Sequence, residues 1–527
     1  MIAVSDAWKD IHQRFILPEG HIEIKCELSE VGVQELAVPS GANEAVFSNV
    51  SRVTDNEDSA TAPKYATNEL NMWVLDGTMS VLPDSAPYET RGYVSDISET
   101  GSVTLKFPSV RTVAIPGVVI TWSDQYGEYP PVFTVTAKNG ETVVAELTVT
   151  DNTEKKSLID LELVNYDSVT VTVHNWCLPY RRARIESISL GHTLILNKND
   201  ILSFTHEQHG DILSAEIPKN SIEFSLNNLD GRWNPSNPTG MERYLSERQR
   251  LTVKYGFTMD DKSIEWIKAG TYYLSEWNAP SNGIEARFTA RDALEFILNE
   301  ENKTLKTDTL KNLAEMAVGS IPAGMTVEID DSLANYKANY KGDSTLGVVL
   351  QKCANASGCV IRYDRDGVLH VEPLKLDATD YTIPLSLSYS YPEIELSKPL
   401  KTVSVAYGEN GYKYDLFVGS SGEIQTVNNS FISAETQAAE VAEIVKDALE
   451  SRKRVKGSFR GDPRLDLFDI VFVETKYGGM MSIVITNIKY TFNGTFNGSY
   501  EGRVMNSVVD GESSKLDEFI LDESSLE

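Results

Sequence analysis

Two histidines three positions apart, His206 and His209, enclose a Glu-Gln pair and are the first residues to consider for metal chemistry. A zinc-protease motif places its two histidines four positions apart on a helix, with Glu directly after the first. The spacing here is one residue too short, and the flanking runs Ile201–Phe204 and Ile212–Ser214 have the composition of strands. We therefore predict that the histidines lie in a polar loop, and we expect no metal and no other cofactor.

Two further short motifs look like binding loops. Asp364–Gly367 reads Asp-Arg-Asp-Gly, as at the start of a calcium loop, but an EF-hand needs Gly at position 6 and Glu at position 12. This chain has Leu369 and Lys375 there, so we predict a hairpin turn. Arg460–Asp462 spells the integrin tripeptide Arg-Gly-Asp. Because Pro463 follows it, we interpret the segment as a tight loop rather than a recognition motif.

The usual catalytic patterns are missing from the sequence: it contains no G-x-S-x-G elbow, no P-loop and no G-x-G-x-x-G. The 77 acidic residues allow many carboxylate pairs, but a glycosidase pair is recognised by its separation in space. Trp73, Trp122, Trp176 and Tyr180 could stack on a sugar ring, although aromatic residues in strands more commonly fill a core. We predict no catalytic residue and keep Trp73, Trp176 and Tyr180 as candidate glycan contacts.

The charge balance of the chain narrows the classes of partner. Its 527 residues suffice for three or four domains, and 41% hydrophobic content is ordinary for buried cores. The net charge is -29, from 77 acids against 48 Lys and Arg. A surface this negative repels phosphate backbones and anionic lipids. We therefore expect no nucleic acid binding and no attachment to an anionic membrane.

Cysteine usage and the first residues bear on the compartment. Cys26, Cys177, Cys353 and Cys359 are too few for a disulfide scaffold, and the last two lack the spacing of a zinc knuckle. We expect small buried hydrophobes in a reducing cytoplasm. Charges interrupt the first fifteen residues, where a signal peptide needs an apolar core, and no run of about 18 apolar residues occurs. We expect synthesis in the cytoplasm and no membrane span.

Strand patterns dominate the elements that must position these residues. Val169, Val171 and Val173 alternate with polar residues, as in a half-buried strand. Two strand-like runs flank Asn139-Gly140, the pair favoured in two-residue hairpins because both positions need a positive φ. No helix pattern of useful length occurs between residues 42 and 190. Such a stretch suits a β-sandwich.

Three segments of this stretch carry a resemblance: 64–77, which ends Trp73-Val-Leu-Asp-Gly, then Val119-Ile-Thr-Trp122, and 174–186, which begins His-Asn-Trp. They resemble the opening, middle and closing strands of discoidin-like, galactose-binding-type jelly rolls. That family implies a two-sheet sandwich whose loops at one end often hold a sugar or another ligand. The resemblance rests on the strand pattern and identifies no ligand residues.

The most specific signal lies between residues 221 and 297. A strand with Ile222, Phe224 and Leu226 on one face leads into Asn228-Leu-Asp230-Gly231-Arg232-Trp-Asn234-Pro235-Ser-Asn237-Pro238, and later into Phe288-Thr-Ala-Arg-Asp292. Asp-Gly and two Asn-Pro pairs predict a rigid turn. Both phrases are similar to the first barrel of phage tail hub proteins, which has an N-x-D-G-R loop and an F-x-A-x-D junction from strand to helix.

A second phrase, Gly461-Asp462-Pro463-Arg-Leu-Asp-Leu-Phe-Asp469, resembles the G-D-P loop in the second barrel of the same family. Between the two barrels the sequence turns helical. Leu310, Leu313, Met316 and Ala317 share a face, and a second helix opens at Ser344 as N-cap and ends near Gly358. A third helix is predicted over Ser433–Arg454, with basic residues at its carboxyl end favoured by the helix dipole.

These observations predict a mainly β, multidomain protein: a jelly-roll sandwich and two hub-type β-barrels with a small α+β insert. The expected ranges are 1–41, a segment of the hub or the sandwich; 42–190, the sandwich; 191–300, barrel 1; 301–379, the insert; 380–508, barrel 2 with one helix; and 509–527, an acidic tail that is flexible or docks.

The resemblance implies a structural, non-enzymatic tail-tip or baseplate hub of a phage or phage-tail-like particle. Three copies would form a ring that closes the tail tube and anchors host-attachment parts, with the sandwich outward toward cell-surface glycans. Implied partners are a distal tail or tail tube protein, a tape-measure protein and a tail fibre or receptor-binding protein. The loops at Asp230–Pro238 and Gly461–Pro463 are the expected assembly residues. The alternative is a carbohydrate-active, cell-wall-degrading enzyme that uses the sandwich as its binding module.

Overall fold

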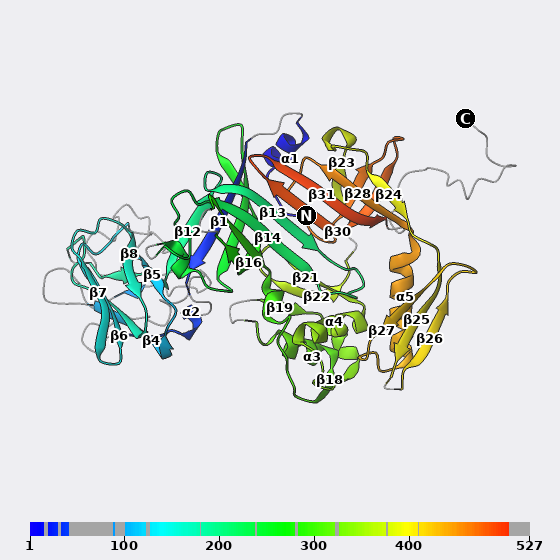
Figure 1. Ribbon diagram of the computed structural model, residues 1–527, viewed down its shortest axis with the longest axis horizontal. Helices are drawn as coiled ribbons and strands as arrows, with labels where there is room; N and C mark the ends of the chain where they lie inside the picture. Colours follow the sequence, from blue (N-terminus) through cyan, green and yellow to red (C-terminus); the bar gives the residue numbers. More distant parts are fainter. Residues whose placement is uncertain are drawn as a thin grey trace, which may run out of the picture.

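The protein is mainly β and multidomain, as the sequence predicts. The computed structural model describes residues 1–14, 19–29, 33–41, 88–89, 101–122, 127–179, 181–237, 240–279, 283–321, 326–375, 378–408 and 410–504 (Figure 1). Separate apolar cores divide these residues into module 1, the sandwich, module 2 and an α/β lobe. Within the described residues, no helix is both long and apolar enough to span a membrane.

Module 1 is a curled sheet that begins close to the amino terminus. Helix α1 (Asp6–Gln13) is capped by the Ser5 side chain and packs Trp8 and Ile11 on the module core. The strand order is β12-β1-β15-β16-β17-β14-β13. The strands are β1 (Gly20–Leu28), β12 (His192–Asn197), β13 (Ile201–His209), β14 (Lys219–Asn227), β15 (Arg250–Thr258), β16 (Ile264–Asn278) and β17 (Glu285–Arg291).

The sandwich is inserted between two paired strands of module 1. Leu28, the last residue of β1, lies opposite His192, the first of β12, so both connections leave from one place. Gly191 makes this junction with a φ of +100°, and a Cβ there would lie 2.3 Å from the carbonyl oxygen of Leu28. Any larger residue would therefore clash. The predicted amino-terminal segment 1–41 is divided between the two parts, because β1 belongs to module 1 and the residues from Val33 onward belong to the sandwich.

Two sheets enclose the sandwich core. The five-stranded sheet has the order β2-β4-β9-β6-β7 and the three-stranded sheet the order β11-β5-β8, with a two-stranded pair β10-β3. Their elements are α2 (Val33–Leu36), β2 (Val38–Gly41), β3 (Tyr88–Glu89), β4 (Gly101–Arg111), β5 (Ile115–Thr121), β6 (Phe133–Asn139), β7 (Thr142–Val149), β8 (Lys156–Leu163), β9 (Tyr166–Val173), β10 (Arg184–Ile185) and β11 (Ser187–Leu190).

Local sequence patterns in the sandwich have mixed outcomes. Val169, Val171 and Val173 in β9 are all buried, as their alternation predicts. The β6–β7 hairpin forms, but Asn139 pairs with Thr142, which leaves Gly140 and Glu141 as the turn. Only Gly140 of the pair has a positive φ, +58°. The turn is shifted by one residue from the predicted Asn-Gly position, and a bulge at Ala137/Lys138 accompanies the shift.

Module 2 continues the sheet of module 1. Strand β13 pairs with β30 from Phe204↔Phe492 to His209↔Asn487, which joins both modules in one 13-stranded sheet. The two predicted barrels are therefore two curled parts of one sheet, each with its own core. The strands of module 2 are β23 (Ala378–Ile383), β24 (Glu393–Leu396), β28 (Lys453–Phe459), β29 (Ile470–Glu474), β30 (Met480–Phe492) and β31 (Phe496–Val504).

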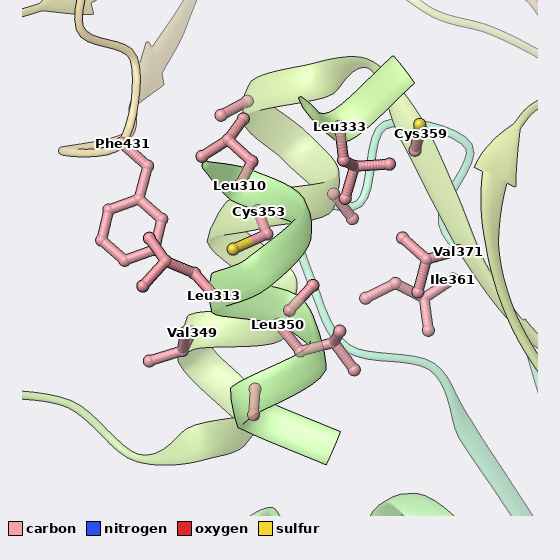
Figure 2. Close-up of a cluster of buried hydrophobic side chains, with 14 of the residues drawn as sticks. Leu310, Leu313, Leu333, Val349, Leu350, Cys353, Cys359, Ile361, Val371 and Phe431 are labelled. Carbon is pink, nitrogen blue, oxygen red and sulfur yellow. The ribbon is translucent and has the colours of Figure 1, made fainter. Parts of the chain in front are cut away.

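The α/β lobe is larger than the predicted insert 301–379. One core joins its helices to residues as late as Val445. Figure 2 shows the centre of this core, where Leu310, Leu313, Val349 and Leu350 meet Ile361 and Val371. The elements are β18 (Lys306–Thr309), α3 (Leu310–Val318), β19 (Val327–Ile329), β20 (Lys337–Tyr340), α4 (Leu346–Ser357), β21 (Cys359–Tyr363), β22 (Leu369–Pro373), β25 (Leu400–Tyr407), β26 (Tyr412–Phe417), β27 (Glu423–Asn428) and α5 (Glu435–Glu450).

Two helix ends differ from the prediction. Helix α4 takes Thr345 rather than Ser344 as its N-cap, while Gly358 ends it in the left-handed conformation as expected. Helix α5 stops at Glu450, and its last turn contains no basic residue. The basic run Arg452–Arg454 instead enters β28, because that strand pairs with β24 and β31. Helix α5 packs on β25 and β26 in the lobe, not in module 2.

Cys26, Cys353 and Cys359 are buried and Cys177 is half-buried, all as free thiols. Burial raises the pKa of the Cys26 thiol to about 12 and also raises that of Cys353. These side chains therefore pack as small hydrophobes, as expected for buried thiols.

Removal of buried methyl groups from the lobe core tests its contribution. Leu350→Ala leaves a cavity between α4 and the sheet, so we expect it to lower the free energy of unfolding of the lobe by about 3 kcal/mol. Leu305→Ala makes the same change at an exposed position and should cost less than about 0.5 kcal/mol. Urea unfolding followed by lobe-specific hydrogen exchange measures both. Equal losses in the two variants would contradict the assigned core.

Candidate functional site

The loop that follows β14 is built on two buried anchors. Asn228 and Trp233 are both buried, and the Asn228 side-chain oxygen accepts a hydrogen bond from the Trp233 backbone N–H at 3.0 Å. The Trp233 ring packs edge-on against Phe288, at 5.2 Å between centroids. Because the strand face of Ile222 and Leu226 is also buried, the base of the loop is fixed to the core of module 1.

Between these anchors the tip of the loop reaches solvent. Leu229 is 74% exposed, Asp230 is exposed, and Gly231 has a φ of +69°. The Asp230 carboxylate accepts the Arg232 N–H at 3.1 Å, which closes the turn.

The Asn-Pro part of the loop is also held in place by its own hydrogen bonds. Backbone bonds run from Asn234 to Gly231 at 3.1 Å and from Asn237 to Asn234 at 2.9 Å, and the Asn237 side chain donates to the Gly231 carbonyl. Pro235 is exposed, and Pro238 lies outside the described residues. The loop is thus shaped before any partner arrives, which lowers the entropy lost on binding.

The second expected assembly segment, 461–469, lies inside the chain. Gly461, Asp462 and Pro463 are all buried. The Arg464 guanidinium pairs with the Asp462 carboxylate at 2.5 Å and holds the pKa of that acid below its usual range despite its burial. Side chains enclosed in this way do not reach a neighbouring subunit. This segment therefore organises the protein internally, in contrast to the exposed loop at Asp230.

Arg365 joins the lobe to this segment, and its role is not apparent from the sequence. The hairpin turn predicted at Asp364–Gly367 forms between β21 and β22, but Arg365 at its tip is buried. Its guanidinium donates to the carbonyl oxygens of Pro463 and Leu465 and lies 3.8 Å from Asp466. Arg365 and 461–469 together form what we call the polar seam between the lobe and the two modules.

His206 lies on the module side of the polar seam and not in a loop. It belongs to strand β13, is fully buried, and hydrogen-bonds with the Tyr255 hydroxyl at 2.6 Å and with the Tyr272 hydroxyl at 2.5 Å. Burial holds its pKa well below the usual value, so it is neutral. The prediction of a polar loop is wrong, because both histidines lie in β13, which pairs with β14 and β30. At a spacing of three on a strand, their side chains point to opposite faces. Among the described residues, no cluster of three or more metal-binding side chains occurs.

The predicted junction after Phe288 forms, with Asp292 as its cap. Strand β17 ends at Arg291, and the Asp292 side chain accepts the Leu294 N–H at 3.0 Å at the start of a 3-10 turn, Ala293–Phe296. Asp292 is buried, which raises its pKa to about 7. A carboxyl group held this way changes charge near neutral pH.

The candidate glycan contacts do not form a sugar platform in the described residues. Trp176 is only 5% exposed and donates its indole N–H to Glu128 at 2.7 Å, so its ring belongs to the sandwich core. Trp122 is fully buried beside it. Trp73 and Tyr180 lie outside the described residues. The prediction of Trp176 as a glycan contact is therefore wrong, because a stacked sugar needs an open ring face.

A hollow of about 640 Å³ lies on the lobe and is lined by polar groups. Lys311 pairs there with Asp331 at 2.5 Å, and His370 with Glu328 at 3.2 Å. The lining offers two lysines, carboxylates and an imidazole.

The polar seam predicts an unequal response of two arginines on one hairpin. Arg365→Met leaves two buried carbonyl oxygens without their donor and the Asp466 carboxylate without its neighbouring positive charge, so the free energy of unfolding should fall by about 3–5 kcal/mol. Arg362→Met breaks a half-buried pair with Glu372 and should cost about 1 kcal/mol or less. Denaturant unfolding compares them. If the Arg365 variant were as stable as the Arg362 variant, the contacts of Arg365 in the polar seam would not contribute to the stability of the protein.

Asp292 predicts a pH dependence of stability. Its folded pKa of about 7 exceeds the unfolded value near 3.8, so the folded state binds the proton more tightly and stability falls as the pH rises from about 4 to 7. Asp292→Asn keeps the cap without the charge, and at pH 8 it should raise the free energy of unfolding by up to about 4 kcal/mol.

This gain should shrink as the pH approaches 4. Asp230→Asn, at an exposed cap of the same type, serves as control and should show a nearly flat difference with pH. Unfolding midpoints measured from pH 4 to 8 give both curves. A gain for Asp292→Asn that does not depend on pH would contradict the raised pKa.

Comparison with known proteins gives matches only among solved structures. No family model matches the sequence, and no curated protein matches it. The chain is similar to a tail protein from Neisseria meningitidis MC58, with 12% identity over 59% of this chain and 94% of that chain and a TM-score of 0.45. It is also similar to a 43 kDa tail protein of prophage MuSo2 from Shewanella oneidensis, at 13% identity over 60% and 95% of the two chains, with a TM-score of 0.41.

A third match is a chitosan-binding module of a chitosanase/glucanase from Paenibacillus sp. IK-5. The identity is 12%, over 32% of this chain and 98% of that module, with a TM-score of 0.19. The solved structures that cover more than half of this chain include tail proteins.

Proposed function

We propose that this chain is a structural tail-tip or baseplate hub protein of a phage or phage-tail-like particle, and that it performs no catalysis. Three copies form a ring that closes the tail tube, and modules 1 and 2 supply its repeating units. The observation that carries this proposal is the pairing of β13 with β30, which makes the two modules one rigid unit. Such a unit presents the preformed loop at Asp230 in a fixed direction.

In this proposal the protein acts through its shape and its contacts with other proteins, and not through a catalytic group. The proposed partners are a distal tail or tail tube protein, a tape-measure protein, and a tail fibre or receptor-binding protein. The proposed location is the tail tip of the particle, after synthesis in the host cytoplasm. The sandwich is attached through two adjacent connections at Leu28 and His192, so it projects from the ring without interrupting the sheet.

The net charge opposes association of copies at long range. Each chain carries -29, so the copies repel one another until apolar and complementary local contacts meet. Salt screens this repulsion over about 10 Å at 0.1 M. Ring formation should therefore strengthen between low and moderate salt, in contrast to an assembly held by opposite net charges.

Light scattering on the purified full chain tests the ring. We expect a mass three times the 58.4 kDa of the chain and ring-shaped particles in negative stain, in a fraction that grows with salt. Replacing 30–190 by a two-residue turn between β1 and β12 should leave the trimer intact. A monomer that releases reducing sugar from cell-wall glycans would instead establish the alternative, a carbohydrate-active enzyme.

A further inference from the structure

An exposed aromatic cluster lies on module 2, away from its core. Tyr477, in the β29–β30 turn, is 91% exposed, and Tyr389, Tyr391 and Met480 are also exposed. Lys476 extends between two of the rings, with its ammonium 5.4 Å from the Tyr391 ring centre and 5.8 Å from that of Tyr477. We call Tyr391, Lys476 and Tyr477 the tyrosine patch. Exposed Tyr side chains in one place are typical of the centre of a protein interface.

The charge at the tyrosine patch is positive, in a chain that is strongly negative overall. Within the described part of the chain, no carboxylate forms an ion pair with Lys476, whose contacts are the two rings. A partner that offers an apolar side chain beside a carboxylate would pack on the exposed tyrosine rings and neutralise the lysine. The exposed tip of module 1, formed by Leu229 and Asp230, has both groups in adjacent positions.

The tip carries further apolar surface. Ile284, just before β17, is exposed and accepts the Asn228 backbone N–H at 2.7 Å, so it lies at the base of the same loop. One oxygen of the Asp230 carboxylate accepts the Arg232 backbone N–H at 3.1 Å, and the other lies 3.8 Å from the Arg232 side chain, so the exposed acid can still face a cation on its solvent side. The apolar and acidic groups of the tip thus match the aromatic and basic groups of the tyrosine patch.

The tip and the tyrosine patch lie at opposite ends of the joined modules. The loop of the tip contacts the β12–β13 turn through Arg232 and Asp200, and β12 is at the left of the sheet in Figure 1. The patch includes Tyr391, directly before β24, which is at the right. Two complementary surfaces at opposite ends of a rigid unit are suited to contacts between successive copies, which close a ring when the rotation permits.

We propose that the tip of one copy docks on the tyrosine patch of the next copy, with Leu229 against the exposed sides of Tyr391 and Tyr477 and Asp230 against Lys476. The proposal rests on the proposed ring and names its contact. The occupant is a second copy of this chain because both halves of the contact belong to the same sequence. The contact is heterologous, so each copy uses its tip once and its patch once.

Cysteine cross-linking tests the contact directly. In a Cys177→Ser background, which removes the one half-buried thiol, we combine Leu229→Cys with Tyr477→Cys in the full chain. Oxidation should give covalent dimers and trimers, because a disulfide needs Cα atoms within about 7 Å. The control joins Leu229→Cys to Phe417→Cys, at an exposed aromatic residue of the lobe. Cross-linking at Phe417 that equals that at Tyr477 would overturn the proposal.

Charge reversal gives an independent readout. Asp230→Lys and Lys476→Glu each place like charges in the contact and should weaken self-association at least tenfold by light scattering. The double reversal should restore it to within a few-fold of the parent. If both single variants associate weakly and the double variant does not recover self-association, the pairing of Asp230 with Lys476 is rejected.

The outcomes also separate the contact from the ring itself. A trimer that forms in the parent without a Leu229–Tyr477 cross-link leaves the proposed hub standing and rejects this interface. A parent that stays monomeric at every salt and protein concentration rejects both.

Discussion

The hydrogen bonds between β13 and β30 are the constraint on which the rest of the protein depends. They turn two curled sheets, separated by more than two hundred residues of chain, into one continuous sheet. The pairing brings His206 and Gln208 of β13 to the polar seam, where Gln208 donates to Asp466 at 3.2 Å. Without that ladder the loop at Asp230 and the tyrosine patch would have no fixed relation.

The polar seam shows how specificity and stability differ in this fold. Arg365 and Asp466 are buried, and desolvation of such charges costs several kcal/mol unless each finds partners. A nearby apolar cluster, with Val360, Phe468 and Val484, supplies attraction at the same place without direction. The polar contacts define a single docking position for the hairpin tip, which an apolar surface alone would leave less defined. The need for a single docking position explains why Arg365 is buried at a place where a leucine could also pack.

The sequence was sufficient for features that depend on neighbours along the chain and insufficient for those that depend on distant partners. The turn at Asp230 forms as predicted, since local turn chemistry determines it. The junction after Phe288, expected from the resemblance, also forms, and Asp292 caps it. Arg365 reads as an exposed turn residue because its acceptors lie about a hundred positions away. In the sequence Trp176 is a candidate sugar platform, although aromatic residues in strands more commonly fill a core, and the hydrogen bond of its indole to Glu128 places it in the core. The predicted helix extended past the true end of α5, because the basic residues that follow pair with β24 and β31 as part of a strand.

The insertion of the sandwich between β1 and β12 has a mechanical consequence. A pull on the sandwich reaches the sheet at Leu28 and His192, two points that face each other across a single ladder. Strand β12 is an edge strand, whereas β1 is also held by β15 on its other side. Tension would therefore unzip β12 bond by bond from that end, while β1 stays in place. Strand β12 would therefore separate first, and the other strands of the two modules would stay paired.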